Sequence, residues 1–322
     1  GIAVEQGGSL QIVRRRGKVA SLERTASHFD LDGTCGIGHT RWATHGRPSE
    51  RNAHPHTDCS GRFAVVHNGI IENFAALKEE LAGRGHEFRS DTDTEVIAHL
   101  IEEAYEGDLL DAVRMAARRL VGAYGLAVTC TFEPGVIVAA RKDSPVIIGA
   151  GETGAIVASD IVAIVDETRD AVVLENDTFA RMACVDGEVS ISYRDFDGEA
   201  IEPEVMHVDW DISAAERGGY PDFMMKEIFE QPRTIRDTLA GRMVNGHLKF
   251  DELTLNFEEL AAIDRVYIIA CGTSYHAGLV AKNLIEGWSR IPCEVEVASE
   301  FRYRNPIVTP STLVVAVSQS GE

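Results

Sequence analysis

The sequence predicts a chain of two parts, an α+β layered domain followed by a parallel α/β domain. Residues 73–86, 92–105 and 108–122 have apolar residues at helical spacing, and a run of short β-branched segments follows them. Helices followed by many short strands are typical of an α+β domain. Residues 264–287 instead have the pattern of a strand, a glycine-containing loop and a helix, and two further strand candidates follow. This rhythm predicts a parallel sheet.

The first domain begins with short apolar runs, of which residues 63–69 (FAVVHNG) predict a strand that ends in an Asn-Gly turn. The first helix stops near a glycine, the second starts with a Thr/Asp cap and Glu95 in its first turn, and the third is Asp-capped and Gly-terminated. Six strands are then expected: YGLAVTC, GVIVAAR, PVIIGAG, AIVASD, IVAIVD and DAVVLEN.

The connection between the domains has little periodicity. Residues 206–225 predict a linker, and residues 226–242 predict a helix with Pro232 near a break or in the first turn. The expected organisation is therefore a first domain over residues 1–205, a linker with a connecting helix over 206–250, and a second domain over 251–322.

Composition excludes several classes of protein. The chain has 322 residues, 44% of them hydrophobic and 25% charged, which is globular and long enough for about two domains. A net charge of −20 would repel nucleic-acid phosphates. The six cysteines show no CxxC spacing, and no apolar run approaches the ~20 residues that span a bilayer. We expect a cytoplasmic protein that binds neither nucleic acid nor membrane.

Residues 39–46 (HTRWATHG) crowd hydrogen-bond donors and a large aromatic side chain into one stretch. An arginine holds a carboxylate through two parallel hydrogen bonds and an aspartate holds an ammonium group, so Arg41 and Asp93 together suit an α-amino acid. Asn68 and Gly69 can present a side-chain amide and a backbone N–H to one oxygen, and each such donor is worth about 3 kcal/mol in acyl transfer. Trp42 can cover the pocket and exclude water.

A metal site is the alternative chemistry for this region. His39, His45, His54 and His56 lie close in sequence, and His-x-His can bind zinc. No acidic or thiolate ligand accompanies these four histidines at a suitable spacing, so we expect no metal.

Several motifs resemble those of a known family. GIGHTRWATHG, NAHPH, VVHNGIIEN and SDTDTEVIAHLI resemble the glutaminase domain of class II (Ntn-type) glutamine amidotransferases. KEIFEQP, ACGTSYHAG and SEFRYR extend the resemblance over nearly the whole chain, to the members that aminate fructose 6-phosphate. The resemblance implies an Ntn-type αββα sandwich followed by an incomplete sugar-isomerase (SIS) parallel-sheet domain.

The resemblance also implies roles for the residues of the pocket. Arg41 would bind the carboxylate of glutamine, Asp93 its α-ammonium group, and Asn68 with Gly69 would form the oxyanion hole. The alternative for Arg41 and Asp93 is an ordinary surface or ion-pair role.

Three further residues of the crowded stretch receive roles from the same resemblance. Thr44 and His45 would shape the glutamine pocket, and Trp42 would gate the channel between two active sites. The alternatives are loop-stabilising hydrogen bonds for Thr44 and His45 and simple packing for Trp42.

The nucleophile of the family is an N-terminal cysteine whose own α-amino group serves as the base. The chain starts instead with GIAVEQGG, which resembles a strand inside the family's domain. Cys35 and Cys59 carry no free α-amine. We therefore expect a fragment that does not hydrolyse glutamine by itself.

The second domain has two loops suited to anions. CGTSYHAG (271–278) and SQSGE (318–322) each follow a strand, where backbone N–H groups and a helix dipole can bind phosphate, although a plain turn fits equally well. By resemblance to SIS domains, the phosphate and hydroxyls of fructose 6-phosphate would be held by Thr273, Ser274, Ser318, Gln319 and Ser320.

The function implied is glutamine hydrolysis, passage of ammonia to the sugar site, and conversion of fructose 6-phosphate to glucosamine 6-phosphate, the first step of hexosamine synthesis. No nicotinamide, flavin or pyridoxal motif is present in the sequence, so no cofactor is implied. The full-length protein would be a homodimer. The alternatives are another class II amidotransferase, a sugar deglycase, or a non-catalytic module that binds glutamine or a phosphosugar.

Overall fold

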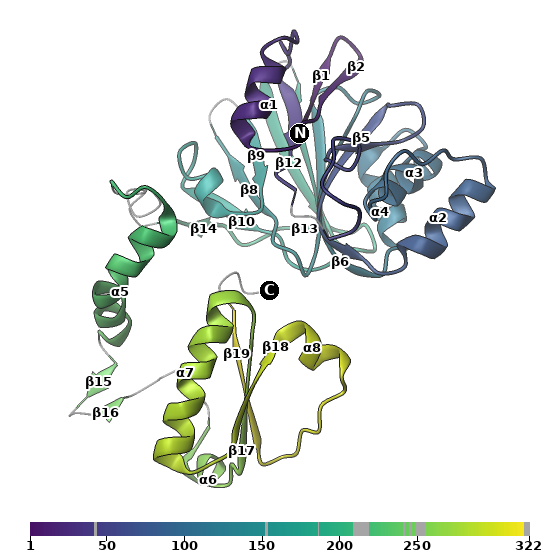
Figure 1. Ribbon diagram of the computed structural model, residues 1–322. Helices are drawn as coiled ribbons and strands as arrows, with labels where there is room; N and C mark the ends of the chain where they lie inside the picture. The colour runs from purple at the N-terminus through teal and green to yellow at the C-terminus, as the bar shows by residue number, and fades with distance from the viewer. Residues whose placement is uncertain are drawn as a thin grey trace. The chain divides into compact units, whose positions relative to one another are not determined.

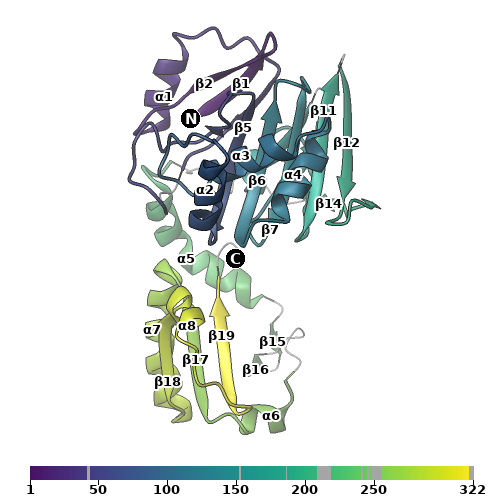
Figure 2. The same ribbon diagram turned by 90° about the vertical axis from the view of Figure 1, so that its right-hand side faces the viewer.

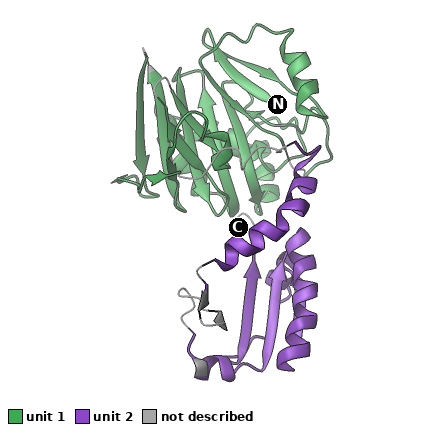
Figure 3. Ribbon diagram, turned by 90° about the vertical axis from the view of Figure 1, so that its left-hand side faces the viewer, with its two compact units in different colours: residues 1–216 green, residues 217–322 purple. Residues whose placement is uncertain are grey.

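A computed structural model describes residues 1–41, 44–151, 154–185, 187–208, 219–240, 242–244, 247–248 and 255–318. The chain forms two compact units, Gly1–Glu216 and Arg217–Glu322, which are coloured separately in Figure 3. The division thus falls inside the segment 206–250 that the sequence suggested as the connection.

Unit 1 is organised around a seven-stranded sheet in which every neighbouring pair is antiparallel. Its order is β13-β12-β11-β7-β6-β5-β4. The strands are β4 (His56–Thr57), β5 (Phe63–Ile71), β6 (Gly122–Cys130), β7 (Val136–Lys142), β11 (Thr178–Val185), β12 (Glu188–Arg194) and β13 (Ala200–Ile201).

Two smaller sheets and four α-helices complete the described part of unit 1. One sheet, β2-β1-β3, consists of β1 (Ile2–Gln6), β2 (Ser9–Val13) and β3 (Cys35–Gly38). The other, β14-β10-β8-β9, consists of β8 (Ile147–Ala150), β9 (Ala155–Ala158), β10 (Asp170–Val173) and β14 (Met206–His207). The helices are α1 (Val19–Ala26), α2 (Phe74–Gly83), α3 (Glu95–Ala104) and α4 (Leu109–Ala117).

The seven-stranded sheet is covered on both faces. Successive residues of a strand point to opposite sides, so each central strand contributes side chains to two cores. On β5, Phe63 and Val65 belong to the core shared with helices α2, α3 and α4 (Figures 1 and 2). Their neighbours Ala64 and Val66 pack instead with Ala3 of β1 in the opposite layer. The central strands are apolar on both faces for this reason, and the predicted layered α+β class is confirmed.

Two local predictions in unit 1 are wrong. Residues 161–166 (IVAIVD), expected as a strand, contain the 3₁₀-helix η1 (Ile161–Ala163), where the Asp160 side chain accepts a hydrogen bond from the Val162 N–H at 3.0 Å. The Asn-Gly pair is not a turn either. Strand β5 continues through it to Ile71, with Gly69 paired to Tyr124 of β6.

The predicted helices are present with shifted starts and ends. The expected Asp cap of α4 is confirmed, because Asp108 accepts a hydrogen bond from the Asp111 N–H at 2.9 Å. The expected Thr/Asp cap of α3 is wrong: the N-cap residue is Thr94, and its side chain makes no capping bond. Its hydroxyl lies 3.0 Å from His54 Nε2 and 3.0 Å from His67 Nδ1 instead.

Unit 2 contains the predicted parallel sheet. Strand β17 (Arg265–Ala270) lies between β18 (Cys293–Val297) and β19 (Thr312–Val317), both parallel to it, and α7 (Gly272–Ser289) follows β17 directly (Figure 2). The other elements are α5 (Phe223–Leu239), β15 (Met243–Val244), β16 (His247–Leu248), α6 (Phe257–Ala261) and α8 (Ala298–Tyr303). Pro232 lies inside α5 and does not end it.

Candidate functional site

Strand β5 carries the Asn-Gly pair of the predicted oxyanion hole. Gly69 has a φ of +123°, and a β-carbon at this position would lie 2.1 Å from the carbonyl oxygen of Ala123 on β6. Only glycine can adopt this backbone while the strands stay paired. The backbone geometry of β5 therefore requires glycine at position 69, next to Asn68.

His39 fixes the orientation of the Asn68 amide. The distance from His39 Nε2 to Asn68 Oδ1 is 2.7 Å. Burial lowers the pKa of His39, so the ring is neutral at physiological pH and Nε2 carries the proton that it donates. Because the amide oxygen of Asn68 is occupied by this bond, its NH₂ group is the part that can donate to a ligand.

Arg41 is held by backbone carbonyl groups four and five residues further along the chain. Its Nη2 donates to the carbonyl oxygens of His45 and, at 2.9 Å, Gly46. Burial lowers the pKa of Arg41, and the negative charge of Asp93 opposes that shift. These bonds engage one of the three guanidinium nitrogens and fix the plane of the group, which suits two-point binding of a carboxylate.

Asp93 is buried against the end of the strand that carries Asn68. Only 3% of Asp93 is exposed, and its Oδ2 accepts a hydrogen bond from the Ile71 N–H at 2.9 Å. The same oxygen lies 3.8 Å from His45 Nδ1. Asp93 is therefore linked through His45 to the loop of Arg41 and through Ile71 to β5, so the three predicted binding groups share one neighbourhood.

Two cavities meet at His39. One, of about 140 Å³, is lined by His39 and Asn68 together with residues of β3, β6 and β9. The other, of about 380 Å³, is lined by His39, Thr40 and Arg41. Asp93 is among the lining residues of neither. The structure therefore brings Arg41 and Asn68 to adjacent cavities rather than into a single one.

The other site residues predicted within 39–46 lie in different surroundings. The His45 ring packs against Phe74, with ring centroids 4.8 Å apart, while Thr44 is exposed. Trp42 lies outside the described residues.

Three buried histidines support the site: His54 and His56, which belong to the four considered as a metal alternative, and His67, which does not. His54 and His67 both contact the Thr94 hydroxyl, and His56 Nε2 lies 3.2 Å from the Thr92 hydroxyl. Burial lowers the pKa of His56 to about 3 and that of His54 well below its usual value. These neutral rings hold the segment that precedes α3, and hence Asp93, against β5.

The supporting roles of two further residues, Asn52 and Glu95, were missed by the sequence analysis. Asn52 is completely buried; its Nδ2 donates to the Arg47 carbonyl oxygen at 3.0 Å and its Oδ1 accepts from the Asp91 N–H at 2.9 Å. Glu95, 3% exposed, accepts hydrogen bonds from the N–H groups of Arg89 and Ser90, both at 2.7 Å. Asn52 gave no signal because it lies in a polar segment and its partner Asp91 is 39 residues away. Glu95 was expected only as an acidic residue in the first turn of a helix.

Two cysteines of unit 1 are unsuited to nucleophilic attack. Burial raises the pKa of Cys35 and of Cys130, so both remain thiols at neutral pH, whereas the thiolate is the reactive form. Neither offers chemistry to the pocket around His39.

The first segment predicted as a phosphate loop, residues 271–278, is not a loop, because α7 begins at Gly272 directly after β17. Of the second, residues 318–322, only Ser318 is described. Ala270, the last residue of β17, pairs with Val317, the last residue of β19, so Thr273 and Ser274 follow the same edge as Ser318. Helix α7 begins at this edge without a side-chain cap, which leaves its first N–H groups available to an anion. Gln319 and Ser320 lie outside the described residues.

Comparison with known proteins identifies the family. Residues 12–191, more than half of the chain, match the family model described as a glutamine amidotransferase domain. The chain belongs to the glutamine amidotransferase domain family. Residues 259–322 match the model of the SIS domain. The recognition made from the motifs of both parts is therefore confirmed.

Similar proteins are glutamine–fructose-6-phosphate aminotransferases (isomerizing). That of Clostridium acetobutylicum is 46% identical over 323 residues, covering 100% of this chain and 52% of its own length. Those of Mycobacterium tuberculosis (50% over 337 residues, covering 100% and 53%) and Streptomyces coelicolor (51% over 326 residues, covering 100% and 52%) are comparable. The chain spans about half the length of the curated relatives it matches.

Solved structures support the fold. The glutamine phosphoribosylpyrophosphate amidotransferase of B. subtilis, in complex with ADP and GMP, aligns with a TM-score of 0.53 at 20% identity, over 91% of this chain and 58% of that one. At this identity the likeness concerns the fold alone, and it confirms the Ntn-type amidotransferase fold predicted for the first domain. Among the described residues, none of the helices has the length and apolar character needed to cross a membrane.

Proposed function

We propose that this amidotransferase chain belongs to an enzyme that takes the amide nitrogen of glutamine and transfers it to fructose 6-phosphate, giving glucosamine 6-phosphate. The names of the relatives and the 46–51% identity over the whole chain support this proposal. Residues 1–205 would form the glutamine domain, 206–250 the connection, and 251–322 the first part of the sugar domain.

The glutamine site is proposed to clasp the amino acid at both ends. Arg41 would bind the α-carboxylate and Asp93 the α-ammonium group, with Thr44 and His45 shaping the pocket. One observation carries this proposal: a chain of contacts runs from Arg41 through His45 to Asp93 and, through Ile71, into the strand of Asn68. A site with one fixed cation and one fixed anion matches a zwitterion.

Asn68 and Gly69 are proposed to stabilise the reacting carbonyl. Attack on the amide carbon places negative charge on the glutamine oxygen. The Asn68 NH₂, which the bond from His39 leaves available, and the Gly69 N–H would donate to that oxygen. Each preorganised donor contributes about 3 kcal/mol to the transition state.

The acceptor site is proposed at the edge of the parallel sheet of unit 2. Thr273, Ser274, Ser318, Gln319 and Ser320 would hold the sugar phosphate and hydroxyls. Ligands of open parallel sheets bind beyond the carboxyl ends of the strands, and the paired ends of β17 and β19 support this placement. Trp42 would gate the passage of ammonia.

The remaining parts of the proposal concern the setting of the enzyme. It would act in the cytoplasm as a homodimer formed through its sugar domains, without nucleic acid, membrane or cofactor. The net charge of −20 supports the exclusion of nucleic acid, because it would repel phosphates.

Calorimetric titration of the 322-residue chain with L-glutamine tests the clasp. We expect Arg41→Ala and Asp93→Asn each to weaken binding at least ~30-fold, since removing one partner of a charged pair costs about 2–5 kcal/mol. Asn at position 93 keeps an oxygen for the Ile71 N–H, so the variant tests charge rather than folding. Arg24→Ala, on the exposed surface of α1, is the matched control.

A ligand series separates the two ends of the clasp. A glutamine analogue without the α-amino group should bind the wild-type chain and Asp93→Asn equally weakly. Glutamine binding that is unchanged in both variants, or no binding to the wild-type chain, contradicts the proposed clasp.

A further inference from the structure

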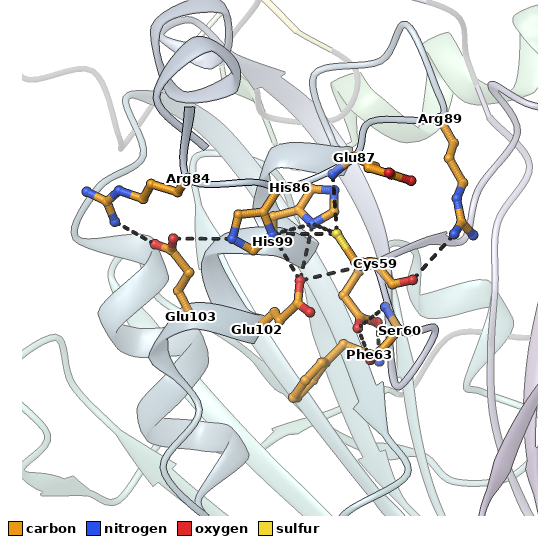
Figure 4. Close-up of polar contacts among 11 residues, drawn as sticks. Cys59, Ser60, Phe63, Arg84, His86, Glu87, Arg89, His99, Glu102 and Glu103 are labelled. Atoms are coloured by element: carbon orange, nitrogen blue, oxygen red, sulfur yellow. Dashed lines mark hydrogen bonds and ion pairs between the residues drawn. The ribbon is translucent and has the colours of Figure 1, made fainter. Parts of the chain in front are cut away.

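A second group of chemically active side chains lies in unit 1, apart from the residues assigned to glutamine. Cys59 follows β4, His86 follows α2, and His99 and Glu102 lie one turn apart on α3 (Figure 4). One ligand atom from each of the four lies within 4.8 Å of the other three. The spacing of these residues in sequence gives no metal motif, so only the fold brings them together.

The distances among these atoms match the edges of a tetrahedron around a metal ion. His86 Nδ1 and His99 Nδ1 are 3.2 Å apart, and Glu102 Oε2 lies 3.1 and 3.3 Å from them. Cys59 Sγ lies 3.7 Å from each of the two nitrogens. Zinc bond lengths of about 2.0–2.1 Å to nitrogen and ~2.3 Å to sulfur give tetrahedral edges of about 3.3 Å between nitrogens and ~3.6 Å from nitrogen to sulfur.

The same atoms have too few protons to satisfy one another. His86 Nε2 lies 3.2 Å from Glu103 Oε1, so this nitrogen carries the ring proton and Nδ1 presents a lone pair. The carboxylate of Glu102 and the sulfur of Cys59 are acceptors as well. One proton on His99 Nδ1 and one on the thiol cannot serve every contact in the group. A cation at the centre satisfies all four lone pairs at once.

The surroundings favour ligands in the deprotonated form. The Glu87 N–H donates to Cys59 Sγ at 3.3 Å, which stabilises a thiolate. Glu103, itself bound by Arg84 Nη1 at 2.8 Å, orients the His86 ring in the carboxylate–histidine–metal arrangement. The His99 side chain is completely buried. Among the described residues its Nε2 has no hydrogen-bonding partner, so the polar contacts of this ring all lie on the side of the group.

We propose that Cys59, His86, His99 and Glu102 bind one Zn²⁺ in a closed structural site. Thiolate and imidazole ligands select zinc over magnesium or calcium, and four protein ligands leave no position for a reacting water. The ion ties the segment after β4 and the segment after α2 to α3, the helix that Asp93 and Thr94 precede. The proposal rests on these contacts and does not depend on the function proposed above.

Metal titration of the full chain tests the site. The purified protein is stripped with a chelator, titrated with Zn²⁺, and assayed for bound metal by mass spectrometry. We expect one ion per chain. Replacement by Co²⁺ should give the intense visible bands of a tetrahedral site and a thiolate-to-cobalt charge-transfer band. Cys59→Ser should abolish the charge-transfer band, whereas Cys184→Ser, at a free cysteine elsewhere in unit 1, should leave it unchanged.

A variant outside the ligand set covers the case in which Cys59→Ser does not fold. Glu103→Gln should weaken zinc binding about 10–100-fold while keeping the charge-transfer band, because partners of ligating histidines have effects of this size. A wild-type chain that stays below one equivalent of zinc overturns the proposal. A cobalt spectrum without tetrahedral bands, or one that survives Cys59→Ser, also overturns it.

Discussion

The two units bury very different amounts of apolar surface. In unit 1 a sheet covered on both faces contributes to a large core with fully buried side chains such as Ile97 and Ile101. In unit 2 the described buried cluster consists of Val266, Ile268 and Cys293. On α7, Trp288 is 80% exposed. Free energy from burial scales with the apolar area removed from water, so unit 2 has much less stabilisation per residue.

The difference extends to the sites. Unit 1 can bury an aspartate and several histidines because a large core offsets the cost of desolvating them. Asp93, His54 and His67 each have a hydrogen-bonding partner, although His54 Nδ1 has none among the described residues. In unit 2, Thr273 and Ser274, which are proposed to hold the sugar phosphate, lie in the exposed or partly exposed first turn of α7. A buried polar network therefore forms in the unit whose larger apolar core can offset its desolvation cost.

The largest effect expected from this comparison comes from removing one core side chain in each unit. Ile101→Ala and Ile268→Ala each cost about 2–5 kcal/mol. We expect unit 1 to stay folded and unit 2 to lose its fold, since Ile268 is one of three residues in its buried cluster. Amide hydrogen exchange by mass spectrometry follows peptides of β5 and β17 separately in both variants.

Protection of β17 that survives Ile268→Ala would show that unit 2 is stabilised by more than its small cluster. The wild-type chain supplies the reference for both peptides.

The second largest expected effect is a loss of stability at low pH in unit 1 but not in unit 2. The pKa of His56 falls from 6.5 to about 3 on burial, and burial also lowers the pKa values of His39, His54 and His67. Above pH 6.5 the ring is neutral in the folded and unfolded chain alike, and its contribution to stability is complete. Below that pH the unfolded chain binds a proton that the folded chain refuses, so stability falls with pH down to about 3.

For His56 alone the loss is about 2 kcal/mol at pH 5, at ~1.4 kcal/mol per pH unit. Hydrogen exchange of β5 should therefore accelerate between pH 7 and pH 5 beyond its intrinsic pH dependence. In unit 2, His276 is exposed, so β17 should not show this additional loss. Equal losses in both units would contradict the assignment of the effect to the buried histidines.

The layers could be predicted from the sequence, whereas the contacts between distant segments could not. Periodicity located α2, α3 and α4, and the β-branched runs located β6 and β7. The Asn-Gly pair favoured a turn locally, but nine residue pairs between β5 and β6 hold it in a strand. The preference of a dipeptide is small compared with the pairing of a whole strand.

Side chains shared between distant segments were the other limit. Thr94 has the sequence position of a cap, yet two histidines compete for its hydroxyl, one 40 and one 27 residues away. The group of Cys59, His86 and His99 was invisible for the same reason, since each residue comes from a different segment. Predicting such groups requires the tertiary fold.

The smallest expected effect comes from removing one helix N-cap in each unit, which is the same local change in both. Asp108→Ala removes the cap of α4 in unit 1, and Asn256→Ala removes the reciprocal cap that Asn256 and Glu259 form at α6 in unit 2. Each loss costs about 1 kcal/mol, because capping is a local interaction that does not depend on the size of the core. Exchange should accelerate in the capped helix of each variant, while Asp108→Asn, which keeps an oxygen at the cap, should change little. If Asn256→Ala accelerated the exchange of β17 as much as Ile268→Ala does, unit 2 would unfold as a whole after even a small perturbation. The two units would then differ in folding cooperativity rather than in buried apolar area.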